Sequence, residues 1–380
     1  MRIALALGGT DWGRSGIGTY VRAVLPHLAR RVAGEGGSIA VIGSPRELEA
    51  YRAVLDGASL VEVPRLCDEP AVGAAWYLAR AGSAAARARA DVLLLPAANR
   101  RMTVASPVPT VAVVHDLAQL EIARKYDPLR MAYLRHVILR ALRSADELVA
   151  VSRATRDAVV AALGPRERDV RVVPNGVDAD RFVPAGPGDA RVELARRETG
   201  IDGPYVLYAA RLEDPGKNHL RLVRAFARSS VRETHVLALA GGDWGARERI
   251  TDEIAAAGVR DRVRLLGYVA DDVLAGLVAG ADAVAMVGMH EGFGLPALEA
   301  LAAGRPVLAS TTGALPEVVG DFGVPCDPTD EGSIRRALER VVRDEAWRAR
   351  IATDGPRWAR AHGWDATAAG LLEACHAALA

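Results

Sequence analysis

The sequence predicts an α/β protein made of two doubly wound domains, and three observations carry this prediction. The chain has 380 residues, more than one hydrophobic core usually organises, so we expect two domains of ordinary size. Short apolar runs alternate with stretches of helical periodicity, which is typical of parallel sheets covered by helices on both faces. The segment 184–188 interrupts this alternation, because its proline and glycine residues continue neither a helix nor a strand.

The N-terminal domain is placed at residues 1–183 and contains the first seven predicted strands. Helical periodicity is clearest at 18–31, 129–142 and 154–163, between strands that a parallel sheet would bury. In a doubly wound sheet ligands bind at the carboxyl ends of the strands, so the residues after each strand are candidates for function. The seven predicted strands are 3–7, 39–42, 60–63, 92–95, 111–114, 148–151 and 170–173.

The C-terminal domain is placed at residues 184–362, after a linker at about 180–190. Residues 363–380 are set apart, because the last predicted helix, 364–379, has no strand after it. The predicted strands of this domain are 206–208, 236–239, 263–265, 283–286 and 307–309.

Composition and charge exclude several classes of protein. Hydrophobic residues make up 50% of the chain and charged residues 25%, which excludes a disordered chain, a collagen and a coiled coil. The 48 basic residues balance 47 acidic ones, so no overall charge attracts nucleic acid or an anionic membrane. Only two basic residues are lysines, Lys125 and Lys217, and we attribute the excess of arginine to the codon bias of the genome.

The cysteines and the apolar runs predict a soluble protein of the cytoplasm. Cys67, Cys326 and Cys375 are odd in number and widely spaced, so neither a disulfide framework nor a structural zinc site is expected. Residues 1–7 are too short for a signal peptide and are interpreted as the first strand. No stretch approaches the roughly 18 uninterrupted apolar residues that a membrane-spanning helix needs.

The strongest motif is the segment 290–306, which predicts a buried helix with one acidic side chain. Pro296 stands near the first helical position and Gly304 at the expected stop. Glu299 is the only polar side chain between 296 and 303, and a buried carboxylate needs a dedicated partner. A ribose diol would serve, and the alternative is a structural contact with a nearby arginine.

The loop before this helix is suited to a phosphate. Gly292 and Gly294 let backbone N–H groups approach a ligand closely, and the helix start carries a partial positive charge. Glu291 precedes the helix and Glu299 lies within it, so the two do not share a helical face as metal ligands would. We therefore expect no metal here.

Two cations follow the first strand of the C-terminal domain. Arg211 leaves the strand end, and Lys217 follows a Pro-Gly turn at the next helix start. A planar guanidinium and a compact ammonium on one loop suit a diphosphate. The alternative is a solvated surface pair.

The first loop of the N-terminal domain, 13–21, superficially resembles a dinucleotide-binding fingerprint. Gly16 and Gly18 fit the pattern, but Val21 stands at the third glycine position and no acidic residue ends the second strand. NAD binding is therefore disfavoured. The glycines still allow the loop to approach a phosphate or an acceptor through its backbone.

Three further features have both structural and functional interpretations. His115 ends an apolar strand, where its position favours function although a lone histidine is more often structural. Asn175 lies in a turn-rich strand end for which the two interpretations are even, whereas Ser152 and Thr155 are most simply helix-cap residues. The basic amphipathic segment 124–143 is interpreted as a core-packed helix rather than a membrane-surface helix.

Taken together, these segments resemble the retaining glycosyltransferases of the GT-B fold, family 4 (group 1) type, and within them the mannosyltransferase-like members. The similarity covers almost the whole chain. It departs at Val287-Gly288, where the family commonly has Pro-Ser, and in the first loop, which is longer than a minimal glycine turn. The segments that carry it are EGFGLPALEALAAGRPV from Glu291, RLEDPGKN from Arg211, PNGVD at 174–178, GIGTY at 16–20, VHDL at 114–117 and LPEVVGD at 315–321.

The resemblance implies two Rossmann-like domains facing across a cleft, a nucleotide-diphosphate sugar held mainly by the second, and an acceptor approaching from the first. It places Glu291 at the hydroxyls of the donor sugar and Glu299 at the ribose. Arg211 and Lys217 would stabilise the charge that grows on the leaving diphosphate. The remaining donor contacts that it implies are the backbone of Gly292, Phe293, Gly294 and Leu295, with His115 near the sugar and Tyr268 and Val269 near the base.

The resemblance also implies retention of configuration by front-face attack, with no metal, no cofactor and no general base. The last helix commonly crosses back onto the first domain in such folds. GDP-mannose is slightly favoured as donor, and the acceptor is a lipid-linked saccharide, a polysaccharide or a natural-product aglycone. Two alternatives use the same fold, a non-catalytic sugar-nucleotide-binding protein and an NDP-sugar epimerase, and a third is an NAD oxidoreductase.

Overall fold

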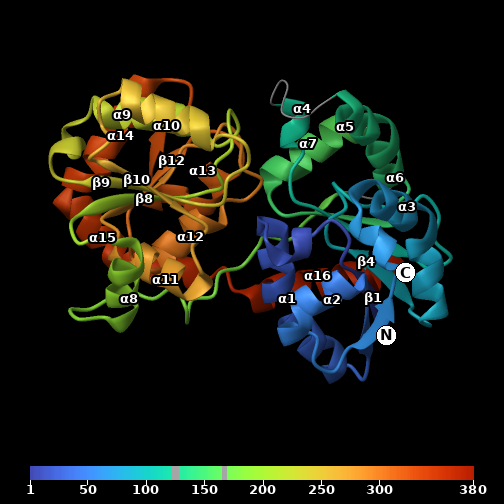
Figure 1. Ribbon diagram of the computed structural model, residues 1–380. Helices are drawn as coiled ribbons and strands as arrows, with labels where there is room; N and C mark the ends of the chain where they lie inside the picture. Colours follow the sequence, from blue (N-terminus) through green and yellow to red (C-terminus); the bar gives the residue numbers. More distant parts are fainter. Residues whose placement is uncertain (122–127, 165–168) are drawn as a thin grey trace. The chain divides into compact units, whose positions relative to one another are not determined.

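The computed structural model describes residues 1–121, 128–164 and 169–380. Two compact units account for the chain (Figure 1): unit 1 is Met1–Gly176 with Trp364–Ala380, and unit 2 is Val177–Gly363. The chain enters unit 2 after Gly176, and the segment 184–188 lies inside this unit, before its first helix. Lys125, with the start of the basic segment 124–143, lies outside the described residues.

Unit 1 is built on a parallel sheet of seven strands, ordered β3-β2-β1-β4-β5-β6-β7. A π-helical turn, Leu134–Ile138, joins α5 to α6 where the sequence predicts one continuous helix. The strands are β1 (Arg2–Ala6), β2 (Ser38–Gly43), β3 (Ser59–Glu62), β4 (Val92–Leu95), β5 (Thr110–Val114), β6 (Glu147–Ala150) and β7 (Arg171–Val172). The helices are α1 (Gly16–Gly34), α2 (Pro45–Tyr51), α3 (Pro70–Arg87), α4 (Ala118–Glu121), α5 (Pro128–Tyr133), α6 (Leu139–Arg143), α7 (Arg153–Leu163) and α16 (Trp364–Leu379).

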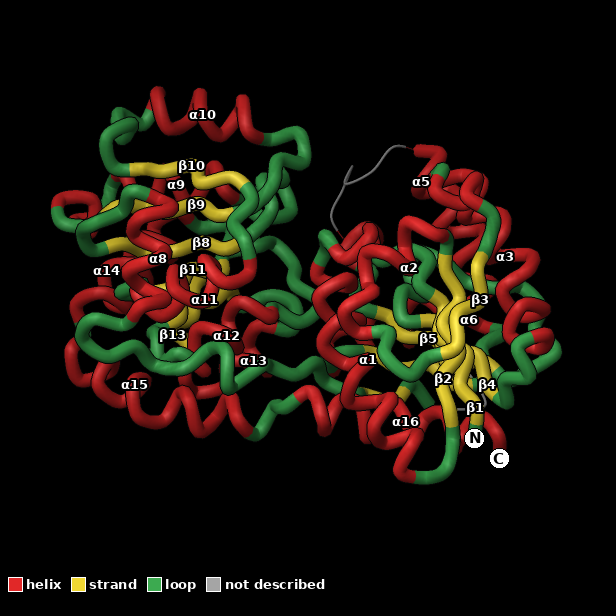
Figure 2. Tube along the Cα trace, turned by 60° about the horizontal axis from the view of Figure 1, so that its bottom comes forward, coloured by secondary structure: helices red, strands yellow, loops and turns green. Residues whose placement is uncertain are grey.

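Unit 2 contains a second parallel sheet, of six strands ordered β10-β9-β8-β11-β12-β13. Figure 2 shows helices on both faces of the sheet in each unit. The strands are β8 (Tyr205–Ala209), β9 (Val236–Ala240), β10 (Val263–Gly267), β11 (Ala283–Met286), β12 (Val307–Ser310) and β13 (Gly323–Cys326). The helices are α8 (Ala190–Thr199), α9 (His219–Ala227), α10 (Arg247–Ala256), α11 (Asp271–Gly280), α12 (Leu295–Ala302), α13 (Leu315–Val319), α14 (Glu331–Arg343) and α15 (Glu345–Arg360).

These two sheets confirm the predicted fold class, two doubly wound α/β units. One strand, β13, was not predicted from the sequence. It contains Gly323 and Pro325, which weaken a strand signal, and it pairs only with β12 at the edge of the sheet. An edge strand tolerates proline because one side of its backbone has no ladder partner.

The last helix belongs to unit 1, where it packs along α1. The Trp364 ring meets the Tyr20 ring edge-on, with the ring centroids 5.9 Å apart. No helix within the described residues combines the length and hydropathy that crossing a lipid bilayer requires.

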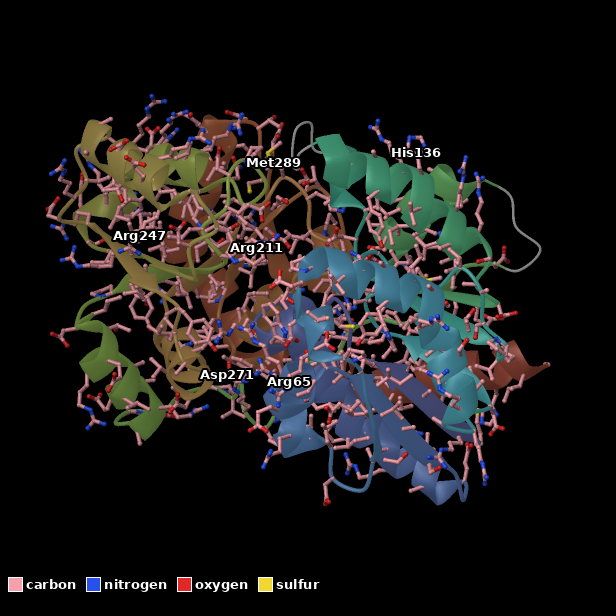
Figure 3. All side chains as sticks on the ribbon, turned by 45° about the vertical axis from the view of Figure 1, so that its right-hand side comes forward. Arg65, His136, Arg211, Arg247, Asp271 and Met289 are labelled. Carbon is pink, nitrogen blue, oxygen red and sulfur yellow. The ribbon has the colours of Figure 1, made fainter. Side chains whose placement is uncertain are left out.

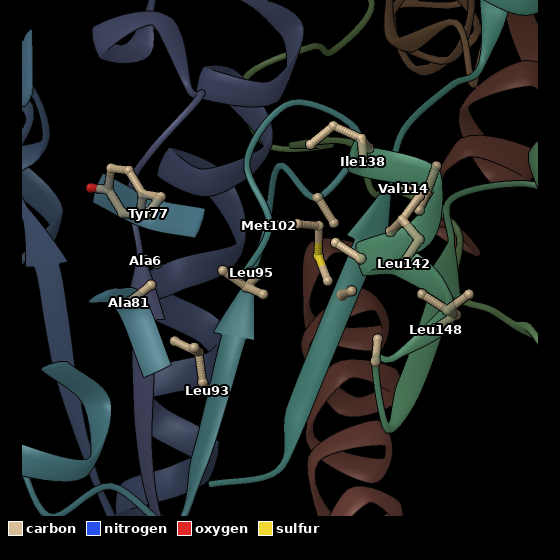
Figure 4. Packing of buried hydrophobic residues seen from close by; sticks show 14 of the residues in the cluster. Ala6, Tyr77, Ala81, Leu93, Leu95, Met102, Val114, Ile138, Leu142 and Leu148 are labelled. Atoms are coloured by element: carbon tan, nitrogen blue, oxygen red, sulfur yellow. The ribbon is translucent and has the colours of Figure 1, made fainter. Parts of the chain in front are cut away.

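Charged and apolar side chains are sorted as in ordinary globular domains. Charged ends stand out around the rim of each unit (Figure 3). The centre of unit 1 is apolar (Figure 4): Leu93 and Leu95 of β4 are fully buried beside Val114 of β5 and Leu142 of α6. Strands buried on both faces explain why their sequences read as continuous apolar runs.

Candidate active site

The candidate site lies where the strand order of unit 2 reverses, between β8 and β11. We call this place the reversal point of the sheet; in doubly wound folds it is where loops diverge and ligands bind. Arg211 and Lys217 lie in the loop after β8, and Glu291 lies in the loop after β11. Figure 3 labels Arg211 and Met289, one from each loop.

Lys217 and Glu291 form an ion pair across the reversal point. The Lys217 ammonium donates to both carboxylate oxygens, at 2.7 and 2.9 Å, and the two side chains are 21% and 11% exposed. Lys217 is expected at the diphosphate of a donor, and the family resemblance places Glu291 at the hydroxyls of its sugar. The structure brings these two groups into direct contact.

Backbone contacts hold the two loops together beneath this pair. Met289 N–H donates to the Gly216 carbonyl at 2.9 Å. The Asn218 amide donates to the carbonyl of Val287 at 3.0 Å and to that of Pro328 at 2.7 Å. Asn218 is buried and adopts a left-handed conformation, φ 61°, that asparagine tolerates better than most residues. The position of Lys217 is therefore set by its neighbours rather than by its own flexible stem.

Two glycines make room for Glu291. A Cβ on Gly313, φ 63°, would lie 2.5 Å from the Glu291 carbonyl oxygen, which the Ala314 N–H also contacts. A Cβ on Gly288 would lie 2.8 Å from Glu291 Oε1. Gly288 is one of the two positions where the chain departs from the family pattern, and here its missing side chain leaves the Glu291 carboxylate its space.

Arg211 is held by two residues that the sequence analysis missed. Its Nε donates to Glu213 Oε2 at 2.6 Å, and its guanidinium carbon lies 4.5 Å from the centre of the Trp244 ring. Trp244 follows β9 and is 50% exposed. The backbone N–H of Trp244 donates to the Leu212 carbonyl at 3.0 Å, which ties the loop after β9 to the loop after β8. An aromatic residue inside the glycine-rich strand end GGDWG was the available signal.

Glu299 lies on α12 with no ion pair among the described residues. Desolvation raises the pKa of its carboxyl to about 7, Arg181 opposes this effect, and Asp271 adds to it. Arg181 itself donates to the Asp271 carbonyl and acts on Glu299 only at a distance. Within the described residues no arginine forms an ion pair with Glu299, although Arg181 lies near enough to affect its pKa.

The loop into α12 has the geometry predicted from its glycines. Gly294 caps the helix with φ 98°, and a Cβ there would lie 2.5 Å from Leu315 Cδ2. Phe293 is buried, whereas Gly292 and Leu295 are half-buried at the start of the helix. Pro296 stands in the first turn and Gly304 follows the last one with φ 66°, so the predicted helix ends are confirmed.

Tyr268 and Val269 follow β10, the neighbour of β9 in the sheet. Tyr268 is 69% exposed and Val269 is half-buried. Trp244 and Tyr268 are therefore two large exposed aromatic side chains at the ends of adjacent strands.

The remaining predicted site residues belong to unit 1. His115 is buried, and its ring meets Tyr20 edge-on while Nε2 lies 2.8 Å from the Pro96 carbonyl oxygen. Burial lowers the pKa of His115 to about 4, so its ring is neutral at physiological pH. Asn175 is also buried, and its Oδ1 has no hydrogen-bond partner in the described part of the chain.

The two glycines of the first loop differ. Gly16 is exposed at the start of α1, and a Cβ there would meet nothing within 4 Å. A Cβ on Gly18 would lie 2.5 Å from Gly13 Cα, so Gly18 is needed for the loop to pack on the helix. At the start of α7, Ser152 accepts from the Thr155 N–H at 3.0 Å, which confirms the predicted cap.

The metal and cysteine predictions are compared with the side chains that the structure describes. Among the described residues, no group of three or more histidine, cysteine, aspartate or glutamate side chains is arranged to hold a metal ion. Cys67, Cys326 and Cys375 are buried and none of the three forms a disulfide.

Comparison with known proteins finds named glycosyltransferases among the relatives. The chain is 35% identical over 282 residues to a D-inositol 3-phosphate glycosyltransferase of Salinispora arenicola, covering 70% of this chain and 63% of that protein. It is 29% identical over 259 residues to O-antigen chain mannosyltransferase B of Escherichia coli, covering 67% of each. The aligned part of the chain thus spans about two thirds or less of the length of these relatives.

Solved structures share the fold. The structure of Anabaena HepE in complex with UDP-glucose matches with a TM-score of 0.76 and 19% identity, covering 98% of both chains. A sucrose-phosphate synthase from Thermosynechococcus elongatus matches with a TM-score of 0.74 and 20% identity, also over 98% of both.

Two family models divide nearly the whole chain between them. The model described as Glycosyltransferase Family 4 matches residues 14–181, in unit 1 and the first residues of unit 2. The model described as Glycosyl transferases group 1 matches residues 192–358, which contain Arg211, Lys217, Glu291 and Glu299. With the two sheets and the structural neighbours, these matches show that the chain belongs to the group 1 glycosyltransferases of the GT-B fold.

Proposed function

We propose that the protein is a retaining glycosyltransferase that moves a sugar from a nucleotide-diphosphate sugar to an acceptor hydroxyl. The observation that carries the proposal is the contact between Lys217 and Glu291 at the reversal point of unit 2. In such a donor the diphosphate is bonded to the anomeric carbon, so a phosphate-binding cation and a sugar-binding carboxylate must lie side by side. This pair has that arrangement.

The neighbouring residues supply the other donor contacts. Glu299 accepts hydrogen bonds from the ribose hydroxyls, and its position inside an apolar helix suits a carboxylate reserved for one ligand. The backbone from Gly292 to Leu295 meets the sugar and phosphate at the start of α12. Tyr268 and Val269 contact the base, and Arg211 joins Lys217 on the diphosphate.

The reaction breaks the bond between the anomeric carbon and the leaving phosphate oxygen and forms one from that carbon to the acceptor oxygen. The acceptor attacks from the face that the diphosphate leaves, so configuration is retained. The acceptor proton passes to the departing phosphate oxygen, which makes a protein base unnecessary. Arg211 and Lys217 stabilise the negative charge on the diphosphate. Because this charge grows toward the transition state, fixed cations stabilise the transition state more than the ground state.

We propose GDP-mannose as the donor. The VHDL and GIGTY segments support it, as does the similarity to a mannosyltransferase; the likeness to a UDP-glucose complex makes a uridine nucleotide the competing choice. The acceptor is a saccharide, free or lipid-linked, or a natural-product aglycone. The buried cysteines fit the reducing cytoplasm as the place of reaction.

A donor panel followed by variants tests the proposal. GDP-, UDP- and dTDP-sugars are screened by thermal shift, because a ligand that binds the native state raises its stability. Donor consumption and transfer are then measured for Lys217→Ala and Glu299→Ala, each expected to fall at least about tenfold, roughly 1.4 kcal/mol in barrier.

Arg197→Ala, which removes an exposed cation of α8, is the matched control and should leave turnover unchanged. Normal turnover in both site variants with folding intact would sink the assignment. Nucleotide binding without donor hydrolysis or transfer identifies a non-catalytic binding protein instead. Conversion of the free NDP-sugar to its epimer identifies an epimerase.

A further inference from the structure

The reversal point of unit 1 is a second place for a ligand. The strand order of this sheet reverses between β1 and β4, so the loops after these strands diverge there. They meet at Gly9, φ 85°: a Cβ on this residue would lie 3.0 Å from Arg101 Cγ and 3.1 Å from Arg100 Cβ. Two arginines from the loop after β4 thus pack against the loop after β1.

Five arginines belong to this loop or contact it, and we call them the arginine cluster. One guanidinium donates to the Gly13 carbonyl at 2.6 Å, and another lies 3.8 Å from the centre of the Trp12 ring. These five come from four different segments of the sequence, so only the fold assembles them. The members of the arginine cluster are Arg14, Arg22, Arg46, Arg100 and Arg101.

The positive charge of the arginine cluster is mostly uncompensated. Arg100 donates to the Asp11 carboxylate and, at 3.1 Å, to the Gly9 carbonyl. Within the described residues, the members of the cluster that form no ion pair are Arg14, Arg22, Arg46 and Arg101.

Arg101 is the member of the arginine cluster whose charge is least solvated. It is half-buried, and its Nη atoms donate to two neutral carbonyl oxygens, those of Arg100 at 3.0 Å and Pro70 at 3.1 Å. Desolvation lowers its pKa, and the nearby Glu47 offsets this only from beyond ion-pair distance. Glu47 is engaged elsewhere, accepting from the Ser44 N–H and the Tyr77 hydroxyl, both at 2.9 Å.

An arginine-rich surface alone does not explain this arrangement. The chain uses arginine for nearly all of its basic residues, so solvated arginines are common on it. A solvated arginine, however, is not desolvated, and a cation taken out of water without a counter-charge destabilises the folded state. Arg101 is kept in such a position at the edge of the sheet where ligands bind.

We propose that the arginine cluster binds a phosphate group carried by the acceptor, with the Arg101 guanidinium as its principal donor. Guanidinium forks match phosphate oxygens in a planar, two-bond geometry, which makes them the preferred donors for phosphate and carboxylate groups. That the phosphate is carried by an acceptor rests on the proposed transferase function. The anion site itself is formed by residues of unit 1 alone.

Phosphate binding is measured with the full chain saturated with GDP or UDP, so that the donor site is occupied. Inorganic phosphate, glucose 6-phosphate and inositol monophosphate are titrated by calorimetry beside glucose and inositol. The phosphate-bearing probes are expected to bind, with affinity falling as salt rises, and Arg101→Gln is expected to weaken them at least tenfold. Arg87→Gln, which changes an exposed arginine of α3, is the control and should change nothing.

The stability of the variant separates binding from a structural role. Because Arg101 is a desolvated cation, Arg101→Gln should leave the melting temperature unchanged or raise it while phosphate binding falls. A lower melting temperature with unchanged phosphate affinity, or equal binding of glucose and glucose 6-phosphate, would overturn the proposal. Absence of any GDP or UDP binding would instead count against the proposed function. The phosphate titration would still test the anion site in that case.

A vesicle experiment identifies the source of the phosphate. Phosphatidylglycerol vesicles and pure phosphatidylcholine vesicles are compared by flotation for the wild type and Arg101→Gln. Flotation that needs phosphatidylglycerol and Arg101 assigns a lipid-borne phosphate. Binding of the soluble phosphates without flotation assigns a free sugar or polyol phosphate. Flotation with phosphatidylglycerol that Arg101→Gln leaves unchanged, alongside no soluble binding, contradicts the site.

Discussion

The reversal point of unit 2 carries cations that are already paired with carboxylates, whereas the reversal point of unit 1 carries cations that mostly are not. Lys217 meets Glu291 and Arg211 meets Glu213, whereas the hydrogen bonds of Arg101 to the described residues go to neutral carbonyls. In unit 2 a carboxylate already balances the charge of these two cations, whereas Arg101 leaves positive charge that a bound anion would balance. Two similar sheets thus differ in how the cations at the same topological position are paired.

The largest effect is expected from breaking the pair in unit 2. Lys217→Ala should lower kcat about 100-fold, the scale seen when one fixed donor to a developing negative charge is lost. Glu291→Ala should also lower transfer, and the double variant should be less impaired than the product of the single effects, because each single change strands the other charge. Steady-state kinetics on all three variants checks this. Strictly multiplicative effects would mean that the two residues act independently.

The next effect is a pH dependence from Glu299. Its carboxyl must be ionised to accept from both ribose hydroxyls, and its pKa in the free protein is raised to about 7 by desolvation. Nucleotide affinity should therefore rise about tenfold from pH 6 to pH 8, with a proton released on binding below pH 7. Calorimetry in buffers of different ionisation enthalpy measures both. Glu299→Gln should flatten the dependence, which separates it from titration of the nucleotide phosphates.

The raised pKa of Glu299 also predicts how the free energy of unfolding changes with pH. The folded state binds this proton more tightly than the unfolded state, whose glutamate has a pKa of about 4.3. Its contribution to folding is fully present below that value and is lost as pH rises toward 7. Chemical unfolding of the wild type and Glu299→Gln across this range should therefore diverge, the variant being relatively more stable at pH 7.

A smaller effect is expected from Trp244, which acts through Arg211. Trp244→Ala should lower kcat about three- to tenfold with little change in KM, because a cation–π contact of this kind is worth roughly 1 kcal/mol. Trp244→Phe should restore most of the loss. If the alanine variant raised KM alone and phenylalanine failed to rescue it, Trp244 would be a donor contact rather than a support for Arg211.

The smallest expected effect compares stability at the two reversal points. Lys217→Met strands the buried Glu291 carboxylate and should cost at least about 1 kcal/mol of unfolding free energy. Arg101→Gln strands no carboxylate and should cost none. Denaturant unfolding of the two variants measures this difference. A greater loss of unfolding free energy in Arg101→Gln than in Lys217→Met would contradict the distinction between a paired cation in unit 2 and an unpaired one in unit 1.

Sequence patterns predicted the sheets well because strands buried on both faces leave continuous apolar runs, as in β4 and β5. They missed β13, whose Gly323 and Pro325 are tolerated only because it is an edge strand. They also singled out Lys217 and Glu291, each separately, as candidate site residues. Nothing local reveals that side chains 74 positions apart share two hydrogen bonds, because this depends on which strands become neighbours.

The supporting residues were harder to predict than the site residues. Trp244 matters through the ring it places beneath Arg211, and an isolated tryptophan in a glycine-rich turn does not specify that contact. Arg101 resembles every other arginine in an arginine-rich chain until its desolvation is known. In both cases the missing information was which groups surround the side chain in the folded protein, and this cannot be read from the local sequence.

The side chain of Asn218 has a consequence for how this protein could be cut or rewired. One amide fastens the residue after Lys217 to the end of β11 and to the turn after β13, 69 and 110 positions away. A fragment ending before Pro328 would retain every residue of the proposed donor site and still lack one of its anchors. Split-protein and circularly permuted designs should therefore keep 218–328 as one uninterrupted piece and place new termini elsewhere.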